Sequence, residues 1–182
     1  MNNSAFISNI MMTRDNSCCF TGHRSIPRDH IDPLRRVVED SISYLYKKGY
    51  RNFICGGALG FDTLAAQTVL RATEHNREIK LILALPCRNQ TERWVSTPYF
   101  DAAAAIREYQ RIRGLADYVV YVNDFATPDC MKQRNQYMVD HSSACIAYRD
   151  PVVWKSGTAQ TVRMAEKSGL EIINTFTILR GK

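Results

Sequence analysis

The stretch ICGGALGFD, residues 54–62, joins a short apolar run to three glycines and then to the start of an apolar-periodic segment. A strand that ends in a glycine-rich turn and leads into a helix is the repeating unit of parallel α/β folds. Glycine also lets a phosphate oxygen approach the backbone, and the unpaired N–H groups at a helix start favour an anion. The stretch alone is therefore compatible with a phosphate-holding loop and with a plain tight turn.

Six apolar runs have strand character and recur at the interval that a strand, a crossover helix and two loops occupy. They begin at Ser17, Arg51, Ile79, Asp117, Ser143 and Glu171, the last as EIINTF through Phe176. Short apolar strands alternating with amphipathic helices predict a Rossmann-like α/β fold: a three-layer, doubly wound, mostly parallel sheet of about six or more strands. In such a sheet, ligands bind at the carboxyl ends of the strands.

The segments between these runs have helical spacing. In the clearest of them Asp32 is the expected N-cap, Pro33 the first helical residue, and Lys47 to Gly49 the end. Further helices are expected over residues 61–75, 100–114 and 157–169, with a shorter one within 131–143.

Length and composition indicate one domain. The chain has 182 residues, of which 45% are hydrophobic, and a formal net charge of +6 that mildly favours anionic partners. We expect residues 1–16 to be loosely ordered and residues 17–182 to form the domain.

The cysteines and the termini indicate a cytoplasmic protein. Its six cysteines contain no C-x-x-C pair, so buried free thiols are expected rather than a metal site or disulfides. The N-terminus does not resemble a signal peptide, and no apolar run approaches membrane-spanning length, so no membrane partner is expected.

The loop after the first strand, FTGHR, carries groups that suit an anion. Thr21 offers a hydroxyl, Gly22 permits close backbone approach, and His23 and Arg24 donate hydrogen bonds. A plain turn with a solvent-facing arginine explains the same residues.

The loop after the second strand offers Gly56, Gly57, Ala58 and Gly60, followed by Asp62. Its glycine spacing matches neither G-x-G-x-x-G nor a Walker A loop, because no Gly-Lys-Ser/Thr follows. Asp62 is a candidate for capping the next helix or for accepting hydrogen bonds from a ribose.

Two later segments add candidates. Gln90 and Trp94 follow the third strand and are candidates for contacting a base edge and a base face, although tryptophan commonly packs within its own domain. Arg134 and Asn135 lie near the start of a helix, where a guanidinium clamps a phosphate or forms a surface ion pair.

The loop after the fifth strand ends in Ser156, Gly157 and Thr158, which enter a helix. Two hydroxyls and free backbone amides favour an anion there, while helix capping alone also explains them. Three such junctions at one sheet edge favour a ligand site.

Together, FTGHR, ICGGALGFDTLAAQ, LALPCRNQTERW, MKQRNQYMVDHSSACIAY and KSGTAQTVRMA resemble the SLOG superfamily of Rossmann-like proteins, which includes DprA, LOG and YpsA. The resemblance spans about residues 17–176 and is closest to the YpsA-like branch. It implies a site for a nucleotide or nucleotide-derived small molecule in a sensor or regulator, and no further cofactor. The residues it carries over are Gly22, His23, Arg24, Gly56, Gly57, Gly60, Asp62, Arg134, Gly157 and Thr158.

Two other branches imply alternatives. LOG is similar to a phosphoribohydrolase that cleaves a nucleotide N-glycosidic bond with a glutamate, but Thr161 stands at that position here and cannot act as a carboxylate. DprA implies binding of single-stranded DNA, for which the sequence offers only scattered basic residues with Trp94 and Tyr99.

No catalytic residue is assigned. The alanine-rich residues 101–109 suit either a homo-oligomer interface or core packing.

Overall fold

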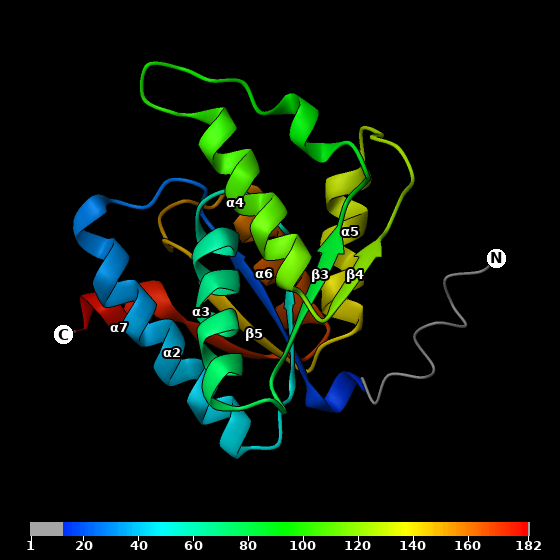
Figure 1. The fold of residues 1–182 in the computed structure, drawn as a ribbon. Coiled ribbons are helices and arrows are strands. Elements are labelled where there is room, and N and C mark those ends of the chain that lie inside the picture. Colours follow the sequence, from blue (N-terminus) through cyan, green and yellow to red (C-terminus); the bar gives the residue numbers. More distant parts are fainter. Residues whose placement is uncertain (1–12, 182) are drawn as a thin grey trace.

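The computed structural model describes residues 13–181, and its centre is one six-stranded sheet (Figure 1). The strand order is β4-β3-β2-β1-β5-β6, and every neighbouring pair is parallel. The strands are β1 Ser17–Gly22, β2 Asn52–Cys55, β3 Lys80–Leu85, β4 Tyr118–Tyr121, β5 Ala144–Tyr148 and β6 Glu171–Asn174. The prediction of a Rossmann-like α/β fold with a mostly parallel sheet is confirmed.

Helices cover both faces of the sheet, which gives three layers (Figure 1). α2, α3 and α4 lie side by side on one face, α7 packs beside α2, and α5 and α6 cover the other face. Each predicted helix is present. The helices are α2 Ile31–Lys47, α3 Phe61–His75, α4 Ala102–Leu115, α5 Cys130–Asp140, α6 Gly157–Lys167 and α7 Thr175–Arg180, and the short 3-10 turns are η1 Arg14–Asn16, η2 Arg28–His30 and η3 Gln90–Arg93.

Alternation along the strands divides the core in two, because successive side chains point to opposite faces. Phe20 and Phe53 pack with the α2 and α3 side chains in one cluster. Cys19 and Ile54, one position along in each strand, pack with α5 and α6 in the other. Both faces of the sheet are therefore buried, as the continuous apolar runs indicate.

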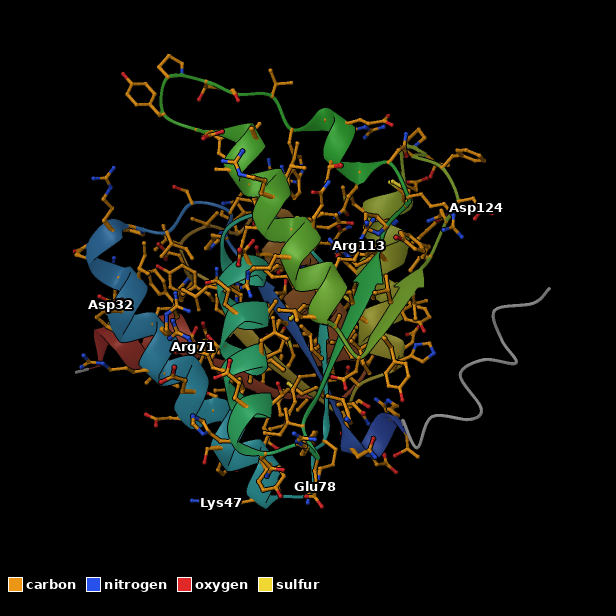
Figure 2. All side chains as sticks on the ribbon, in the orientation of Figure 1. Asp32, Lys47, Arg71, Glu78, Arg113 and Asp124 are labelled. Carbon is orange, nitrogen blue, oxygen red and sulfur yellow. The ribbon has the colours of Figure 1, made fainter. Side chains whose placement is uncertain are left out.

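The helix α2 begins at Ile31, so the prediction of Asp32 as N-cap is wrong. The preceding η2 turn runs directly into the helix, and His30 stands at the N-cap without a side-chain capping bond. Asp32 and Pro33 lie in the first turn instead, where a carboxylate suits the helix dipole and a missing N–H costs nothing. Figure 2 shows Asp32 and Lys47 at opposite ends of α2.

The last predicted strand is shorter than expected. β6 stops at Asn174, whose Oδ1 accepts a hydrogen bond from Phe176 N at 3.2 Å and caps α7. Its Nδ2 donates to Arg149 O at 3.0 Å, which ties this turn to the loop after β5. An amide side chain that caps a helix thus ends the strand despite the β-branched residues before it.

Three further expectations concern the whole chain. All six cysteines are buried and free, as predicted. Of the expected loosely ordered segment 1–16, residues 1–12 lie outside the described residues, and Arg14–Asn16 form η1. Among residues 13–181, no helix has the length and apolar character needed to cross a bilayer.

The order of the strands creates a crevice beside β1. The chain leaves β1 toward α2 on one face of the sheet and leaves β5, its other neighbour, toward α6 on the opposite face. The two loops separate at this switch point, which is where doubly wound sheets bind their ligands.

Candidate functional site

A cavity of about 320 Å³ lies at the switch point between β1 and β5, and we call it the site cavity. Four chain segments line it: the end of β1, the turn before α3, one face of α5, and the start of α6. Its lining includes eleven of the sixteen predicted site residues: Thr21, Gly22, His23, Arg24, Ala58, Asp62, Arg134, Asn135, Ser156, Gly157 and Thr158.

His23 joins the two loops that separate at the switch point. Its backbone N donates to Tyr148 O at 3.3 Å, and its ring Nε2 accepts from Asp150 N at 3.0 Å. Because Nε2 accepts, the neutral ring carries its proton on Nδ1. Burial lowers the pKa of His23, with Asp150 opposing and Arg149 adding to this effect, so the neutral ring is favoured.

Gly60 is the N-cap of α3, so the expectation that Asp62 caps this helix is wrong. Asp62 instead holds the glycine turn, residues 56–60, from within the protein. Asp62 Oδ2 accepts a hydrogen bond from Ala58 N at 3.2 Å, which occupies one amide that was a candidate for holding phosphate. Gly60 has φ of +76° and lies against the backbone of Arg24, where any side chain would overlap the Arg24 carbonyl group. The turn before α3 and the loop after β1 are thereby locked together.

Arg134 is buried behind this turn, with 5% of its surface exposed. Its Nη1 donates to the carbonyl oxygen of Gly56, and its Nε donates to Asn135 Oδ1 at 2.8 Å. Burial raises the pKa of Asp62 and lowers that of Arg134, while the charge of each partly offsets the burial of the other. The guanidinium thus holds the wall of the cavity in place.

The start of α6 forms the opposite wall. Ser156 Oγ accepts from Ala159 N at 3.0 Å and caps the helix, so its capping role is real. The hydroxyls of Thr21 and Thr158 make no hydrogen bond with any described residue, although each residue is only 7% exposed. Both residues line the site cavity, so their hydroxyls are available to a ligand there.

Five predicted residues lie outside the lining: Gly56, Gly57, Gly60, Gln90 and Trp94. The first three shape the glycine turn. Gln90 is buried, and its Nε2 donates to Gly57 O at 2.9 Å, so it fixes the turn from behind. Trp94 packs edge-on against Tyr109, with ring centroids 5.5 Å apart, on the α4 side of the sheet. Neither Gln90 nor Trp94 is available to a base in this cavity.

Three lining residues were not predicted: Phe20, Met131 and Met138. Met131 and Met138 stand one turn before and one turn after Arg134 and Asn135 on α5. Spacings of three and four residues place side chains on one helix face, so the sequence contained a signal for both methionines. Phe20 is a fully buried core residue that also lines the cavity, and no local pattern marks it.

Comparison with known proteins agrees with the motifs. The sequence profile of the YspA SLOG family matches residues 18–176, from the second residue of β1 to the first turn of α7. The chain belongs to the YspA SLOG family. The resemblance to the SLOG superfamily, and to its YpsA-like branch, is thereby confirmed.

Relatives of this YspA SLOG protein occur among bacilli. It is 32% identical to the uncharacterized SPbeta prophage-derived protein YoqJ of Bacillus subtilis strain 168, over 76% of this chain and 81% of YoqJ. It is 25% identical to a UPF0398 protein of Bacillus thuringiensis strain Al Hakam, over 80% of this chain and 77% of that protein.

Two solved structures share the fold. The X-ray structure of TM1055 aligns with a TM-score of 0.53 and 17% identity, covering 86% of this chain and 72% of that one. DNA processing protein A from Helicobacter pylori, described for its single-stranded DNA binding mode, aligns with a TM-score of 0.57 and 18% identity, covering 91% of this chain and 71% of that one.

Proposed function

We infer that this YspA SLOG protein binds a nucleotide or nucleotide-derived small molecule in the site cavity, as a cytoplasmic sensor or regulator. The observation that carries this inference is the convergence of three sequence-distant loop-to-helix junctions on one cavity at the switch point of the sheet. Six free cysteines support a reducing compartment.

Charge and hydrogen-bond capacity in the cavity favour a phosphate. Arg24 is exposed, lines the cavity and makes no side-chain hydrogen bond with the described residues. The N-terminal turn of α6 brings the positive end of the helix dipole to the same place. The unpaired hydroxyls of Thr21 and Thr158 complete a set of donors around the space.

The internal contacts divide the site residues into two roles. Arg24, Thr21 and Thr158 have free donors, so we assign them to the ligand. Arg134 and Asp62 already bind the glycine turn, so we assign them to positioning it. This assignment differs from the expectation that Arg134 clamps a phosphate directly. Arg134 Nη1 already donates to Gly56 O, so fewer of its N–H donors are left for a ligand.

Isothermal titration with AMP and ADP tests the proposal. We expect binding by the native protein and a loss of at least about tenfold for Arg24→Ala, since a charge-assisted hydrogen bond to phosphate contributes about 1.5–3 kcal/mol. Arg36→Ala removes another exposed arginine, on α2 and outside the cavity lining, and should leave affinity unchanged. Absence of binding to both nucleotides would remove the proposal.

Hydrolysis of the glycosidic bond has less support. Thr161, at the position of the LOG glutamate, is buried, and its Oγ1 donates to Gly157 O at 2.9 Å within its own helix. Asp62 is the acidic residue in the lining of the site cavity, and it is committed to Ala58 N. Free base released from AMP, and lost in Asp62→Asn, would reinstate hydrolysis as the activity.

A single strand of nucleic acid is the second candidate ligand. Trp154 lies in the loop two residues before Ser156, is 63% exposed, and has Lys155 Nζ 4.5 Å from its ring centroid. An exposed aromatic with a neighbouring cation is what base stacking on a single strand requires. This candidate predicts oligonucleotide binding that weakens steeply as salt rises and is lost in Trp154→Ala. Fluorescence polarisation with a labelled dT oligonucleotide measures it.

A further inference from the structure

A second cavity, of about 700 Å³, opens beside the site cavity on the face covered by α2, α3 and α4. The turn Ala58–Gly60 stands between them: Ala58 lines the site cavity, and Leu59 lines the second cavity. Arg24 lines both. The two cavities are therefore adjacent, with one unpaired guanidinium at their common border.

Most of the second cavity is apolar. Aliphatic side chains from the loop after β1, from α3 and from α4 form its walls, and Phe100 and Tyr99 contribute aromatic rings. Tyr99 is 99% exposed, so it has no packing role in this fold. Apolar walls with a few polar groups are typical of sites for planar organic groups.

The polar end of the second cavity is cationic. Among the described residues, the Arg35 side chain hydrogen-bonds to the neutral Gln67 Oε1, with both Nη atoms at a long 3.4 Å. Gln67 Nε2 donates to Glu108 Oε1 at 2.8 Å, and Arg111 binds both oxygens of Glu108, so this carboxylate is already paired. Burial and the neighbouring Arg71 lower the pKa of Arg35, while the carboxylates of Glu39 and Asp32 partly offset this effect.

We propose that the two cavities form one bipartite site for a dinucleotide, two nucleosides joined through a pyrophosphate, with Arg24 at the pyrophosphate. One phosphate lies in the site cavity against Thr21, Thr158 and the start of α6. The second nucleoside lies in the second cavity, with its planar base between the apolar walls and Arg35 at its polar end. The proposal rests on the nucleotide binding proposed above and names the ligand class.

The sizes of the cavities support a ligand of this extent. A volume of about 320 Å³ is at the low end for small-molecule sites, and adding the second cavity more than triples the available space. The proposal also explains the run of alanines at the start of α4, because Ala104 and Ala105 line the second cavity. Small residues at these positions keep the cavity open.

Isothermal titration with AMP and with diadenosine diphosphate tests the proposal. Linking a second binding group to a first raises affinity without new contacts by the first, so we expect the dinucleotide to bind at least about tenfold more tightly than AMP. Ala105→Phe fills the second cavity and should abolish this gain while leaving AMP affinity unchanged. Ala103→Phe, on the exposed side of the same helix, is the matched control and should retain the gain.

A second pair of variants keeps the test decisive if Ala105→Phe fails to fold. Arg35→Met should reduce the gain, whereas Arg36→Met, at the exposed neighbouring position, should not. Equal affinity for AMP and the dinucleotide, or a gain that survives both Ala105→Phe and Arg35→Met, would overturn the bipartite site and leave the proposed function intact. Failure of both ligands to bind would instead overturn the proposed function, and the bipartite site with it.

Discussion

Asp62 and Arg134 illustrate how two buried charges of opposite sign shape this site. Neither lies on the surface, and both contact the glycine turn rather than open solvent. A buried charge is tolerated when an opposite charge lies nearby and hydrogen bonds satisfy it. The two residues come from α3 and α5 and bind the same turn, so this turn connects the two helices at the end of the sheet.

We predict that Asp62→Asn lowers the free energy of unfolding by about 3–5 kcal/mol, since it leaves Arg134 buried without its neighbouring negative charge. The asparagine Oδ1 still accepts from Ala58 N, so the change isolates the charge. Urea unfolding followed by circular dichroism measures the loss. Asp40→Asn, an exposed carboxylate on α2, is the control.

The double variant Asp62→Asn with Arg134→Met tests whether the two charges are coupled. Removing both should destabilise less than the sum of the single changes, because neither charge is then left alone. Strict additivity would contradict the coupling.

His23 gives the protein a specific response to acid. Its folded pKa is lowered, so the unfolded chain, with an ordinary histidine pKa of 6.5, takes up the proton first as pH falls. Stability contributed by the neutral ring is complete above that value and is lost as pH falls through the folded pKa. Protonation also removes the acceptor for Asp150 N.

Between pH 7.5 and 5.5, we therefore expect the native protein to lose more stability than His23→Gln, which retains an acceptor but does not titrate. The midpoint of urea unfolding at each pH measures the difference. His75→Gln alters an exposed histidine at the end of α3 and should behave like the native protein. Identical pH profiles for the native protein and His23→Gln would exclude this role.

Between elements, the crossing of Gly60 and Arg24 is a tight backbone junction of the site. Gly60→Ala meets both a positive φ and the Arg24 carbonyl group, whereas Gly169→Ala meets only a positive φ, +72°, with open space around it. We expect Gly169→Ala to cost about 1–2 kcal/mol and Gly60→Ala clearly more, with loss of ligand binding. Thermal and urea unfolding of the two variants measures both costs. Equal destabilisation by the two variants would contradict a tight contact between Gly60 and the Arg24 backbone.

The capping of α6 can be separated from ligand binding by two changes at Ser156. Ser156→Ala should cost about 1 kcal/mol of stability through the lost cap. Ser156→Asp keeps a good cap and should retain stability, but its negative charge at the cavity should weaken nucleotide binding by at least about tenfold. Titration calorimetry beside thermal unfolding distinguishes the two. Unchanged affinity in Ser156→Asp would place the phosphate elsewhere.

Strand and helix types were predictable from this sequence because its apolar periodicity is strong, and α3 begins and ends where the pattern indicates. The start of α2 and the end of β6 were not, because each depends on a local competitor: the η2 turn in one case and the Asn174 cap in the other. Intrinsic preferences do not decide between such alternatives at element ends.

For the whole molecule, the sequence predicted that the loops after β1, β2 and β5 converge, but not which groups their side chains contact. Parallel strands end at one edge, so the junctions after β1, β2 and β5 converge by topology. Whether Gln90 faces a base or Gly57 O depends on a contact between residues 33 positions apart, and no local pattern encodes it. The switch point itself depends on the pairing of β1 with β5, whose residues are more widely separated still.

The buried cysteines allow opening of the unlabelled protein to be measured. Every thiol is at most 1% exposed, and together they span β1, β2, β5, the loop after β3 and the start of α5. A colour-forming disulfide reagent should therefore react only when the structure opens, so its rate follows the population of open molecules. A bound nucleotide should slow that reaction in proportion to 1 + [L]/Kd, which allows unlabelled compounds to be screened on the unmodified protein.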